Sequence, residues 1–387
     1  MSKKLMLPEK VLKSIKKNKK RVNKHTLIAS VLTLILLLIT PLLESKKHAD
    51  TYSNDSAIFT GTMVGDMMFG RHIEEVTKRY GHDYLFEHVK PFFQESDYST
   101  GNFDQPVVLG EYEEIDKLIH FKTGVESVQV LERMNFTNVT LANTHTLDYG
   151  HKGLEDTIHT FENSTVGFVG AGRNLQDAQS ILYEEVNGVT TATLGFTDAY
   201  VKGTRALDER GGILVADPDL FMPLVNEANE HADLVIVHMH WGQEYESHAH
   251  PRQVDMAKAI ADAGADIIIG HHPHVLMSVD IYNDTLIMYS LGNFISDQGW
   301  SRTRDSVLAQ YQLEEDGTGK LIFNPMRIRE GQPKPLTGVS SAYHEARIFR
   351  QLTKETTDSD NWYKEEGKLI FEVDHSHVLE GISNDTE

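Results

Sequence analysis

The sequence contains no cysteine. This absence excludes disulfides, metal sites built on thiolates and a lipid-modified cysteine, so the chain is not a lipoprotein. Positive charge is also scarce, because 37 Lys and Arg face 57 Asp and Glu and the net charge is −20. We detect no internal repeat, and the basic residues beyond the first segment are scattered, so we predict no nucleic-acid partner.

The scarce positive charge is concentrated at the N-terminus. Residues 1–25 contain ten Lys or Arg against one acid, Glu9, which gives a charge of about +9. Because the whole chain is −20, residues 26–387 sum to about −29. Such an asymmetry between two parts of one chain is typical of a protein that meets two environments.

An uncharged apolar run, Leu27–Leu43, follows the basic segment. Its roughly 17 residues are at the lower limit for spanning a bilayer of about 30 Å. The positive-inside rule then places residues 1–25 in the cytoplasm and the main domain outside the cell. A cleaved signal peptide and a buried core helix are the alternatives, but no small-residue cleavage site follows the run and its flank is strongly basic. We therefore predict a single-pass cell-membrane protein with a transmembrane helix at 26–43.

After the anchor, we predict a polar linker at 44–56, a domain at 57–330 and a C-terminal extension at 331–387. Short β-branched runs alternate with helical patterns, and the later runs follow one another through short turns, which favours an α/β fold with mixed sheets. The predicted strands are Ala57–Val64, Phe136–Ala142, Val166–Val169, Val189–Phe196, Leu234–Met239, Ile267–Ile269, Leu286–Leu291, Val307–Leu313, 320–328 and Lys368–Val373. The predicted helices are Ile73–Tyr80, Val125–Met134, Gly153–Glu162, Pro218–Glu230, Pro251–Ala263 and Ala342–Thr353.

Three histidines lie within four residues at the end of one apolar run. His271, His272 and His274 follow Ala265–Ile269. Neutral imidazole is a favoured ligand for zinc, iron, nickel and copper and also accepts manganese, so this strand end is suited to hold a metal ion. A turn with surface histidines is the alternative interpretation of so short a motif.

Other polar groups also follow apolar runs, and in open α/β sheets ligands bind at the carboxyl edge of the strands. Asp66 ends the first run, although an ordinary Asx turn is the alternative there. Asn102 and Asp104 share a face if their segment is extended. His238 and His240 end another run. His238 lies deeper in this run, and that position favours a role in the core. The candidate set is Asp66, Asn102, Asp104, Asn143, His145, His240, His272 and His274.

Mixed carboxylate, amide and imidazole ligands suit divalent Mn, Fe or Zn. Two such ions about 4 Å apart would activate water and clamp a phosphoryl-type oxygen. The sequence therefore predicts a divalent metal site, built from strand ends that lie far apart along the chain.

In their order along the chain, these motifs resemble the CapA/PgsA family of bacterial poly-γ-glutamate capsule proteins over about residues 57–330. The basic tail, the single anchor and the outer domain also match the membrane subunit of that family. The resemblance rests on the segments Val64–Arg71, Gly101–Pro106, Ala142–Gly150, Gly170–Gly172, Leu194–Asp198, His240–Tyr245, Gly270–Val275 and Tyr289–Phe294.

The resemblance implies a metallophosphatase-like two-sheet sandwich flanked by helices, with His145 as the acid that protonates a leaving group. Thr144 stands where the family usually has Asn, and we assign the neighbouring amide of Asn143 to the metal. The resulting metal ligands are Asp66, Asp104, Asn143, His240, His272 and His274. The predicted substrate-binding residues are Arg71, Asn102, Asp148, Asn293, Arg302 and Arg304.

By the same resemblance, the chain is a membrane-anchored subunit for poly-γ-glutamate synthesis or export. Its partners would be the polymer and the membrane and ATP-dependent subunits of the synthase complex. A metal-dependent extracytoplasmic hydrolase, acting on a phosphoester or on the polymer, is the alternative, and a binding module with an unrelated ligand is the third hypothesis. A domain near −29 repels a polyanion at long range, so contact with the polymer requires a local basic patch or a bound cation.

Overall fold

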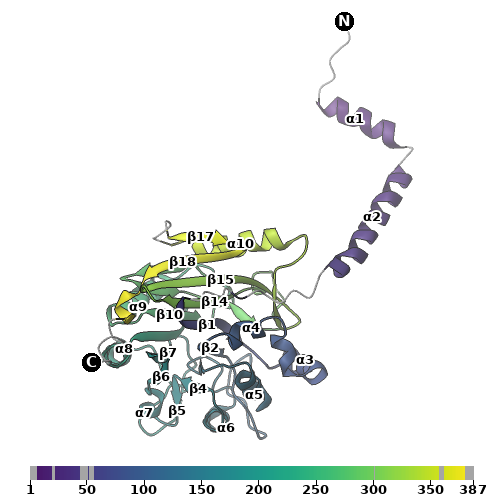
Figure 1. Ribbon diagram of the computed structural model, residues 1–387. Coiled ribbons are helices and arrows are strands. Elements are labelled where there is room, and N and C mark those ends of the chain that lie inside the picture. The colour runs from purple at the N-terminus through teal and green to yellow at the C-terminus, as the bar shows by residue number, and fades with distance from the viewer. Residues whose placement is uncertain are drawn as a thin grey trace. The chain divides into compact units, whose positions relative to one another are not determined.

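The computed structural model describes residues 7–19, 22–43, 51, 56–299, 301–356 and 361–379 (Figure 1). The chain divides into two units, residues 1–47 with 337–340 and the remainder.

The N-terminal unit contains two helices, α1 (Leu7–Asn18) and α2 (Val22–Leu43). Helix α2 contains the predicted anchor at 26–43, which is therefore helical as expected. In the part of the chain that the structure describes, no helix combines the length and the apolar character needed to cross a membrane. Most of the predicted linker at 44–56 lies outside the described residues, as do residues 1–6, 20 and 21 of the basic tail.

The second unit contains two large sheets, and the larger one has ten strands. Its strands β1 to β4 run parallel, whereas β14, β15, β17 and β18 pair antiparallel. The order across this sheet is β17 (Trp362–Glu365), β18 (Lys368–Asp374), β15 (Thr318–Arg329), β14 (Asp305–Glu314), β1 (Ala57–Met67), β2 (Tyr98–Phe103), β3 (Asn138–Thr140) and β4 (Gly167–Val169), with β13 (Asn293–Ile295) beside β1 and β16 (Gln332–Pro335) beside β15.

The smaller sheet has six strands, and its four inner strands run parallel. A separate two-stranded ribbon joins β5 (Ala171–Gly172) to β8 (Gly212–Ile213). The order across the six-stranded sheet is β11 (Val279–Tyr282), β12 (Thr285–Met288), β10 (Ile267–His271), β9 (Leu234–His240), β7 (Val189–Thr197) and β6 (Leu182–Val186).

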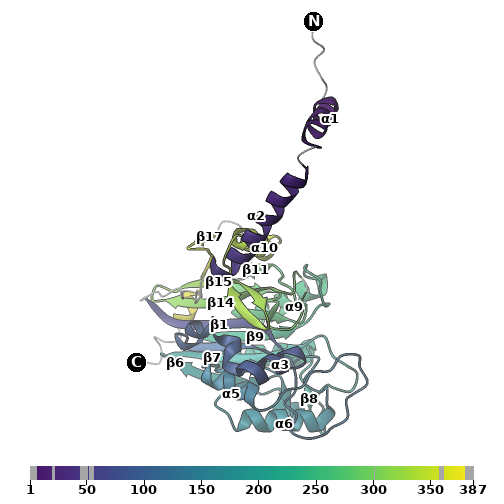
Figure 2. The same ribbon diagram turned by 90° about the vertical axis from the view of Figure 1, so that its right-hand side faces the viewer.

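The helices of the second unit lie outside the sheets, as Figures 1 and 2 show. Helices α5 and α6 lie at one end of the unit, and α10 lies beside β17 at the opposite end. The helices are α3 (His72–Tyr80), the 3₁₀ helix η2 (His82–Phe86), α4 (Lys90–Gln94), α5 (Glu126–Arg133), α6 (Gly150–Glu162), α7 (Leu175–Ala178), α8 (Pro218–His231), α9 (Pro251–Asp262) and α10 (Ser341–Thr353).

Three apolar clusters hold these layers together. Between the sheets, Phe59 and Val307 of the larger sheet pack in one cluster with Ile236 and Ile269 of the smaller one. A second cluster joins α3 to α6 to the outer face of the larger sheet, and a third joins α8 and α9 to the outer face of the smaller sheet. Because each strand buries alternate side chains on opposite faces, both sheets are covered on two sides. The predicted two-sheet sandwich flanked by helices is confirmed.

Most predicted elements are present with ends shifted by a few residues, but strand β2 was not predicted. Its sequence Tyr98-Ser-Thr-Gly-Asn-Phe103 is polar, although every residue in it is buried. Two of its polar side chains have partners from other strands: Thr100 Oγ1 lies 2.9 Å from His238 Nε2, and Asn102 Nδ2 donates to Asp66 Oδ1 at 2.8 Å. Sequence patterning gives weak signals for such strands, because partners far along the chain offset the cost of burying polar groups.

The predicted extension at 331–387 is integral to the larger sheet. Strand β18 pairs antiparallel with β15, and β16 pairs with the other end of β15. Helix α10 places Ile348 and Leu352 in the cluster between the sheets. The extension thus packs back on the domain. Its residues 357–360 and 380–387 lie outside the described ranges.

Gly270 of β10 is expected to tolerate no side chain. A Cβ at this position would lie 2.0 Å from the carbonyl oxygen of Tyr289, a backbone atom that cannot rotate away. We expect Gly270→Ala to lower the free energy of unfolding by about 2–3 kcal/mol, as overpacking of a core does. Thermal or denaturant unfolding measures this change. Gly299→Ala is the matched control, since no atom of the residues that the structure describes lies within 4 Å of its Cβ position; equal effects of the two substitutions would contradict the prediction.

Candidate metal centre

Sheet register brings the strand-end groups together. Pairing of β1 with β2 sets Asp66 opposite Asn102, and pairing of β1 with β13 sets Asp66 opposite Asn293. In the smaller sheet, β9 and β10 pair His240 with His271. The loop that follows β10 then carries its histidines across to the larger sheet. The carboxyl ends of parallel strands therefore converge at one site, as expected for this class of sheet.

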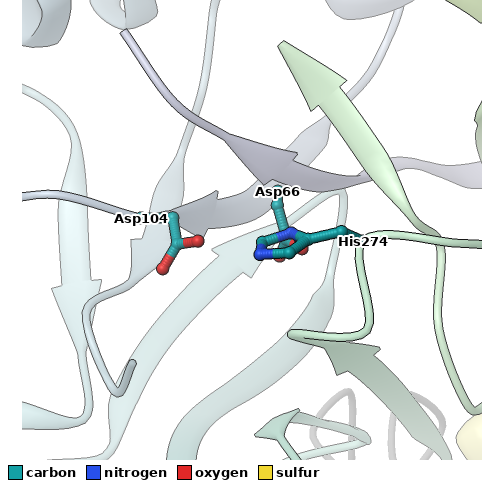
Figure 3. A group of neighbouring side chains, drawn as sticks. All are labelled: Asp66, Asp104 and His274. Carbon is teal, nitrogen blue, oxygen red and sulfur yellow. The ribbon is translucent and has the colours of Figure 1, made fainter. Parts of the chain in front are cut away.

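Asp66 contacts several other groups of this site and is fully buried. Its Oδ2 lies 2.9 Å from His274 Nδ1, and its Oδ1 accepts from Asn102 Nδ2 at 2.8 Å. The same His274 Nδ1 lies 3.0 Å from Asn293 Oδ1. Asp104 completes the group, because one ligand atom from each of Asp66, Asp104 and His274 lies within 4.8 Å of the other two (Figure 3).

Asp104 is the strongest indication of a bound cation. Its carboxylate is completely buried, and neither oxygen has a hydrogen-bond partner among the residues that the structure describes. Burial raises the pKa of Asp104, and the nearby charge of Asp66 raises it further. A buried carboxylate without a donor is costly to a fold, and a positive ion would remove this cost. These residues therefore fit a divalent metal.

The histidines around the group differ in protonation. Burial would lower the pKa of His274, but the hydrogen bond and the charge of Asp66 outweigh burial and raise this pKa to about 9. Burial, and then the charge of His274, lower the pKa of His272 to about 3. Burial also holds the pKa of His240 well below its usual range. His240 and His272 are thus neutral, which is the form that binds metals. Their rings lie close together, with centroids 4.6 Å apart.

A second group, centred on His145, borders the candidate ligands. His145 Nδ1 donates to Asp148 Oδ2 at 2.7 Å, and Lys117 Nζ donates to Asp148 Oδ1 at 2.5 Å. The backbone N–H of Phe121 also donates to Asp148, at 2.7 Å. Because the carboxylate fixes the Nδ1 proton, Nε2 of His145 is the nitrogen that can accept or deliver a proton. This arrangement suits the acid role that the resemblance implies for His145.

The backbone around the site is strained. Four non-glycine residues have positive φ angles: Arg71 (54°), Tyr245 (66°), His272 (96°) and His274 (57°). Such conformations cost energy and persist where the surrounding structure determines them, which is characteristic of functional sites. Two of these residues, His272 and His274, lie in the loop after β10, and His274 Nδ1 lies 2.9 Å from Asp66 Oδ2.

Some predicted residues have other partners. The side-chain amide of Asn143 is fully hydrogen-bonded: its Nδ2 donates to Asn102 Oδ1 of strand β2 at 3.0 Å, and its Oδ1 accepts from the backbone N–H of His145 at 3.0 Å. Asn143 therefore shapes the turn that carries His145, and its role as a ligand stays a prediction. Thr144, its neighbour, approaches His240, with 3.4 Å from the Thr144 backbone nitrogen to His240 Nε2.

The three predicted substrate-binding arginines divide between two places. Arg71 lies at the rim of the site, where it pairs with Asp297 and stacks over Phe121 at 4.9 Å. Phe121 in turn lies against His145, with ring centroids 4.4 Å apart. Arg302 and Arg304 contact Ser247 Oγ and the carbonyl oxygen of Ile328 instead, so the structure does not bring them into the Asp66 group.

Sequence reasoning missed two residues of the site. Lys117 lies in a loop without a recognisable motif, and no local signal indicated that it would reach Asp148. His271 was quoted within its motif but not selected, although its Nδ1 lies 3.5 Å from Asp66 Oδ1. Its Nε2 lies 2.9 Å from Nδ1 of His238, whose other nitrogen contacts Thr100. His238 is thus a hydrogen-bonded core residue, as predicted.

Lys117 is expected to stabilise the buried carboxylate of Asp148. Replacing Lys117 by methionine keeps the apolar stem but removes a charged donor, so we expect the free energy of unfolding to fall by about 1.5–3 kcal/mol. Chemical denaturation measures this loss. Lys122→Met is a control from the same loop, since the Lys122 side chain stacks over Tyr149. The prediction fails if both substitutions cost the same.

Fold and site together define an α/β sandwich protein with a buried carboxylate–imidazole centre suited to a divalent ion. The model of the family "Bacterial capsule synthesis protein PGA_cap" matches residues 60–298, and the chain belongs to this family. It is 45% identical over 388 residues to "Capsule biosynthesis protein CapA" of Bacillus anthracis, covering 98% of this chain and 94% of the relative. It is 46% identical over 384 residues to "PGA biosynthesis protein CapA" of Bacillus subtilis (strain 168), covering 98% and 99% of the two chains.

More distant similarities extend this comparison. A "probable polyglutamine synthesis accessory protein" of Mycobacterium tuberculosis is 29% identical over 231 residues, which cover 55% of this chain and 61% of the relative. Among solved structures, a hypothetical protein from Thermus thermophilus matches with a TM-score of 0.42 at 13% identity, covering 71% of this chain and 95% of that one. A 5′-nucleotidase precursor from the same organism matches with a TM-score of 0.33 at 12% identity, covering 58% and 44%.

Proposed function

We propose that this protein is a membrane-anchored extracytoplasmic subunit of a poly-γ-glutamate capsule synthesis and export machinery. In this role it engages the emerging polymer and stabilises the complex of membrane and ATP-dependent synthase subunits. The observation that carries the proposal is the identity of about 45% over nearly the whole chain to proteins named for capsule and PGA biosynthesis. The basic N-terminal segment and the apolar run that follows support the anchored orientation.

A metal-dependent hydrolase is the second candidate. It is favoured by the unpartnered carboxylate of Asp104 beside Asp66 and His274. In this function Asp66, Asp104, His240, His272 and His274 would hold Mn, Fe or Zn. A bound divalent ion would supply Lewis-acid polarisation of the scissile bond and a lower pKa for water. His145, oriented by Asp148, would give a proton to the leaving group, and Arg71 at the rim would orient an anionic substrate.

The test of the first proposal is deletion of the gene and complementation in a strain that makes the polymer. We expect deletion to reduce cell-associated poly-γ-glutamate at least about tenfold, and the full chain to restore it. Membrane fractionation and a protease applied to intact cells test the anchored, outward orientation. Unchanged polymer in the deletion strain, or protein found away from the membrane, would contradict the proposal.

Site variants separate the two candidates. His272→Ala/His274→Ala and His145→Ala are expected to abolish complementation if hydrolysis is the function. If the protein is only a binding and scaffolding subunit, each variant that folds should still restore the polymer in the deletion strain. Protein level and thermal stability are measured for each variant to show that it folds. His238→Asn is not a suitable control because it disrupts the core; His159→Ala on the surface of α6 is suitable.

A further inference from the structure

A cluster of basic side chains lies where the start of β14, strand β15 and helix α10 meet. We name it the arginine cluster and define it as Arg302, Arg304, Arg327, Arg347 and Lys354. Sequence analysis selected only the first two. The others come from β15 and from the C-terminal extension, so the tertiary structure assembles the cluster. It lies beyond residues 60–298, which match the family model.

The cluster is short of negative charge. One carboxylate oxygen, Oδ1 of Asp305, accepts from both Arg327 Nη1 at 2.6 Å and Arg347 Nη2 at 2.5 Å. Two guanidinium groups therefore share one buried carboxylate. The Nε of Arg347 is buried and has no hydrogen-bond partner within the described ranges. Arginine donors in excess of their acceptors make a site that attracts an anion.

The other three cations are held by neutral oxygens. Arg302 Nη1 lies 3.4 Å from Ser247 Oγ, and Lys354 Nζ donates to the carbonyl oxygen of Ser247 at 2.5 Å. Arg304 Nε donates to the carbonyl oxygen of Ile328 at 2.9 Å. Burial lowers the pKa of Lys354, and the charge of Arg302 adds a smaller lowering. Glu355, 3.9 Å from Lys354, raises this pKa by more than Arg302 lowers it.

The arginine cluster is linked to the candidate metal centre indirectly, through the turn that precedes β14 and through Asn293. Arg327 and Arg347 donate to Ser301, at the start of the turn 301–305. In the middle of that turn, the carbonyl oxygen of Thr303 accepts from Asn293 Nδ2 at 3.1 Å, and Asn293 Oδ1 lies 3.0 Å from His274 Nδ1. A cavity of about 40 Å³ beside the cluster is lined by Arg302, Asp305, Arg347, Val275 and Leu276, the last two of which follow His274 in the chain.

We infer that the arginine cluster is a docking site for a polycarboxylate chain, with successive carboxylates of poly-γ-glutamate as its ligands. The identity of the polymer rests on the proposed function. The distribution of charge favours this cluster as the docking site. Residues 26–387 sum to about −29 and repel a polyanion, so only a local excess of cations allows close contact. Arginine favours carboxylates because its planar fork donates two parallel hydrogen bonds. The polymer would thereby reach the edge of the Asp66 site.

The test measures binding of a fluorescent poly-γ-glutamate of defined length to the full-length protein at two salt concentrations. The variant Arg302→Gln/Arg304→Gln/Lys354→Gln removes three cations but leaves the Asp305 ion pairs intact. Its matched control, Arg79→Gln/Lys152→Gln/Lys258→Gln, removes three exposed cations that stack on tyrosines elsewhere. We expect the first variant to bind at least about tenfold more weakly and with less salt dependence, and the control to change less than about twofold.

Three results would overturn the inference: no binding of the polymer by wild type, equal weakening in both variants, or selective loss of binding to phosphatidylglycerol vesicles in the first variant while polymer binding stays unchanged. Thermal unfolding of both variants verifies that each is folded. The deletion strain separates this inference from the proposed function. If the chain is needed for capsule but the first variant binds polymer like the control, only the docking site is wrong. If the chain is not needed, the proposed function is wrong.

Discussion

Replacing Asp66 by alanine is expected to lower the free energy of unfolding of the metal-free protein by about 3 kcal/mol or more. The reason is that Asp66 is the buried partner of several groups at once: His274 Nδ1 at 2.9 Å, Asn102 Nδ2 at 2.8 Å and His271 Nδ1 at 3.5 Å. Removing one partner of a buried ion pair leaves the other uncompensated, which costs more than the pair itself contributes. Urea unfolding in the presence of a chelator measures the loss.

The coupling between Asp66 and His274 gives this prediction a specific signature. The double variant Asp66→Ala/His274→Ala is expected to be about 1–3 kcal/mol more stable than the sum of the single effects predicts. Because the folded-state pKa of His274 is raised to about 9, the coupling is full below its unfolded-state pKa of about 6.5. It is lost as the pH rises through about 9, where His274 becomes neutral in the folded protein. Additive effects at pH 6 would refute the ion pair.

Replacing Asp104 by asparagine is expected to change metal binding and stability in opposite directions. The substitution removes a ligand carboxylate, so we expect the affinity for Mn, Fe or Zn to fall by more than about 100-fold, beyond what indirect changes around a metal produce. It also removes a buried charge whose oxygens have no donor. The metal-free variant should therefore be about 1 kcal/mol more stable than wild type. Elemental analysis and chelator competition measure the first effect, and thermal unfolding with chelator the second.

A buried carboxylate with partners is the matched control for Asp104. Asp266 accepts from the backbone N–H of Val235 at 2.7 Å and lies 2.7 Å from His377 Nε2. We expect Asp266→Asn to lower stability by about 1–2 kcal/mol and to leave metal content unchanged. If the wild-type protein contains about one equivalent of metal and only Asp104→Asn loses it, the result supports the metal centre and strengthens the hydrolase candidate. A stable, folded wild type without stoichiometric metal would leave the scaffold role as the better account.

The sequence pattern by itself predicted an α/β fold with mixed sheets, and the family resemblance implied the two-sheet sandwich. Runs such as Leu234–Met239 and Ile267–Ile269 are apolar throughout, because parallel strands buried on both faces require it. Helix α9 begins at Pro251 with a capping box from His250 to Gln253, so local chemistry marks its start. Strand β2 was not predicted because its burial depends on partners such as His238, 138 residues away. The periodicity of apolar residues indicates which side chains are buried, but it contains no information about such polar pairs.

The candidate ligands were predicted because strand ends in an α/β sheet have a known direction. Asp66 and His274 each follow an apolar run, and Asp104 shares a face with Asn102 if its segment is extended, so a common sheet edge was expected to collect them. The resemblance to a capsule family, carried by the same motifs, was confirmed by the family match. Local sequence was therefore sufficient to predict which residues form the candidate site.

Only the tertiary structure decided which of these side chains keep polar atoms available for a ligand. Asn143 and Asp104 look equally suitable in the sequence, but strand β2 and the turn after β3 together saturate the amide of Asn143, whereas the carboxylate of Asp104 has no donor among the described residues. Lys117 reaches Asp148 from a loop, and the extension delivers Arg347 beside Asp305. Contacts of this kind depend on sheet register and loop path, which are fixed by packing between distant segments. A single sequence specifies that packing only through the whole fold.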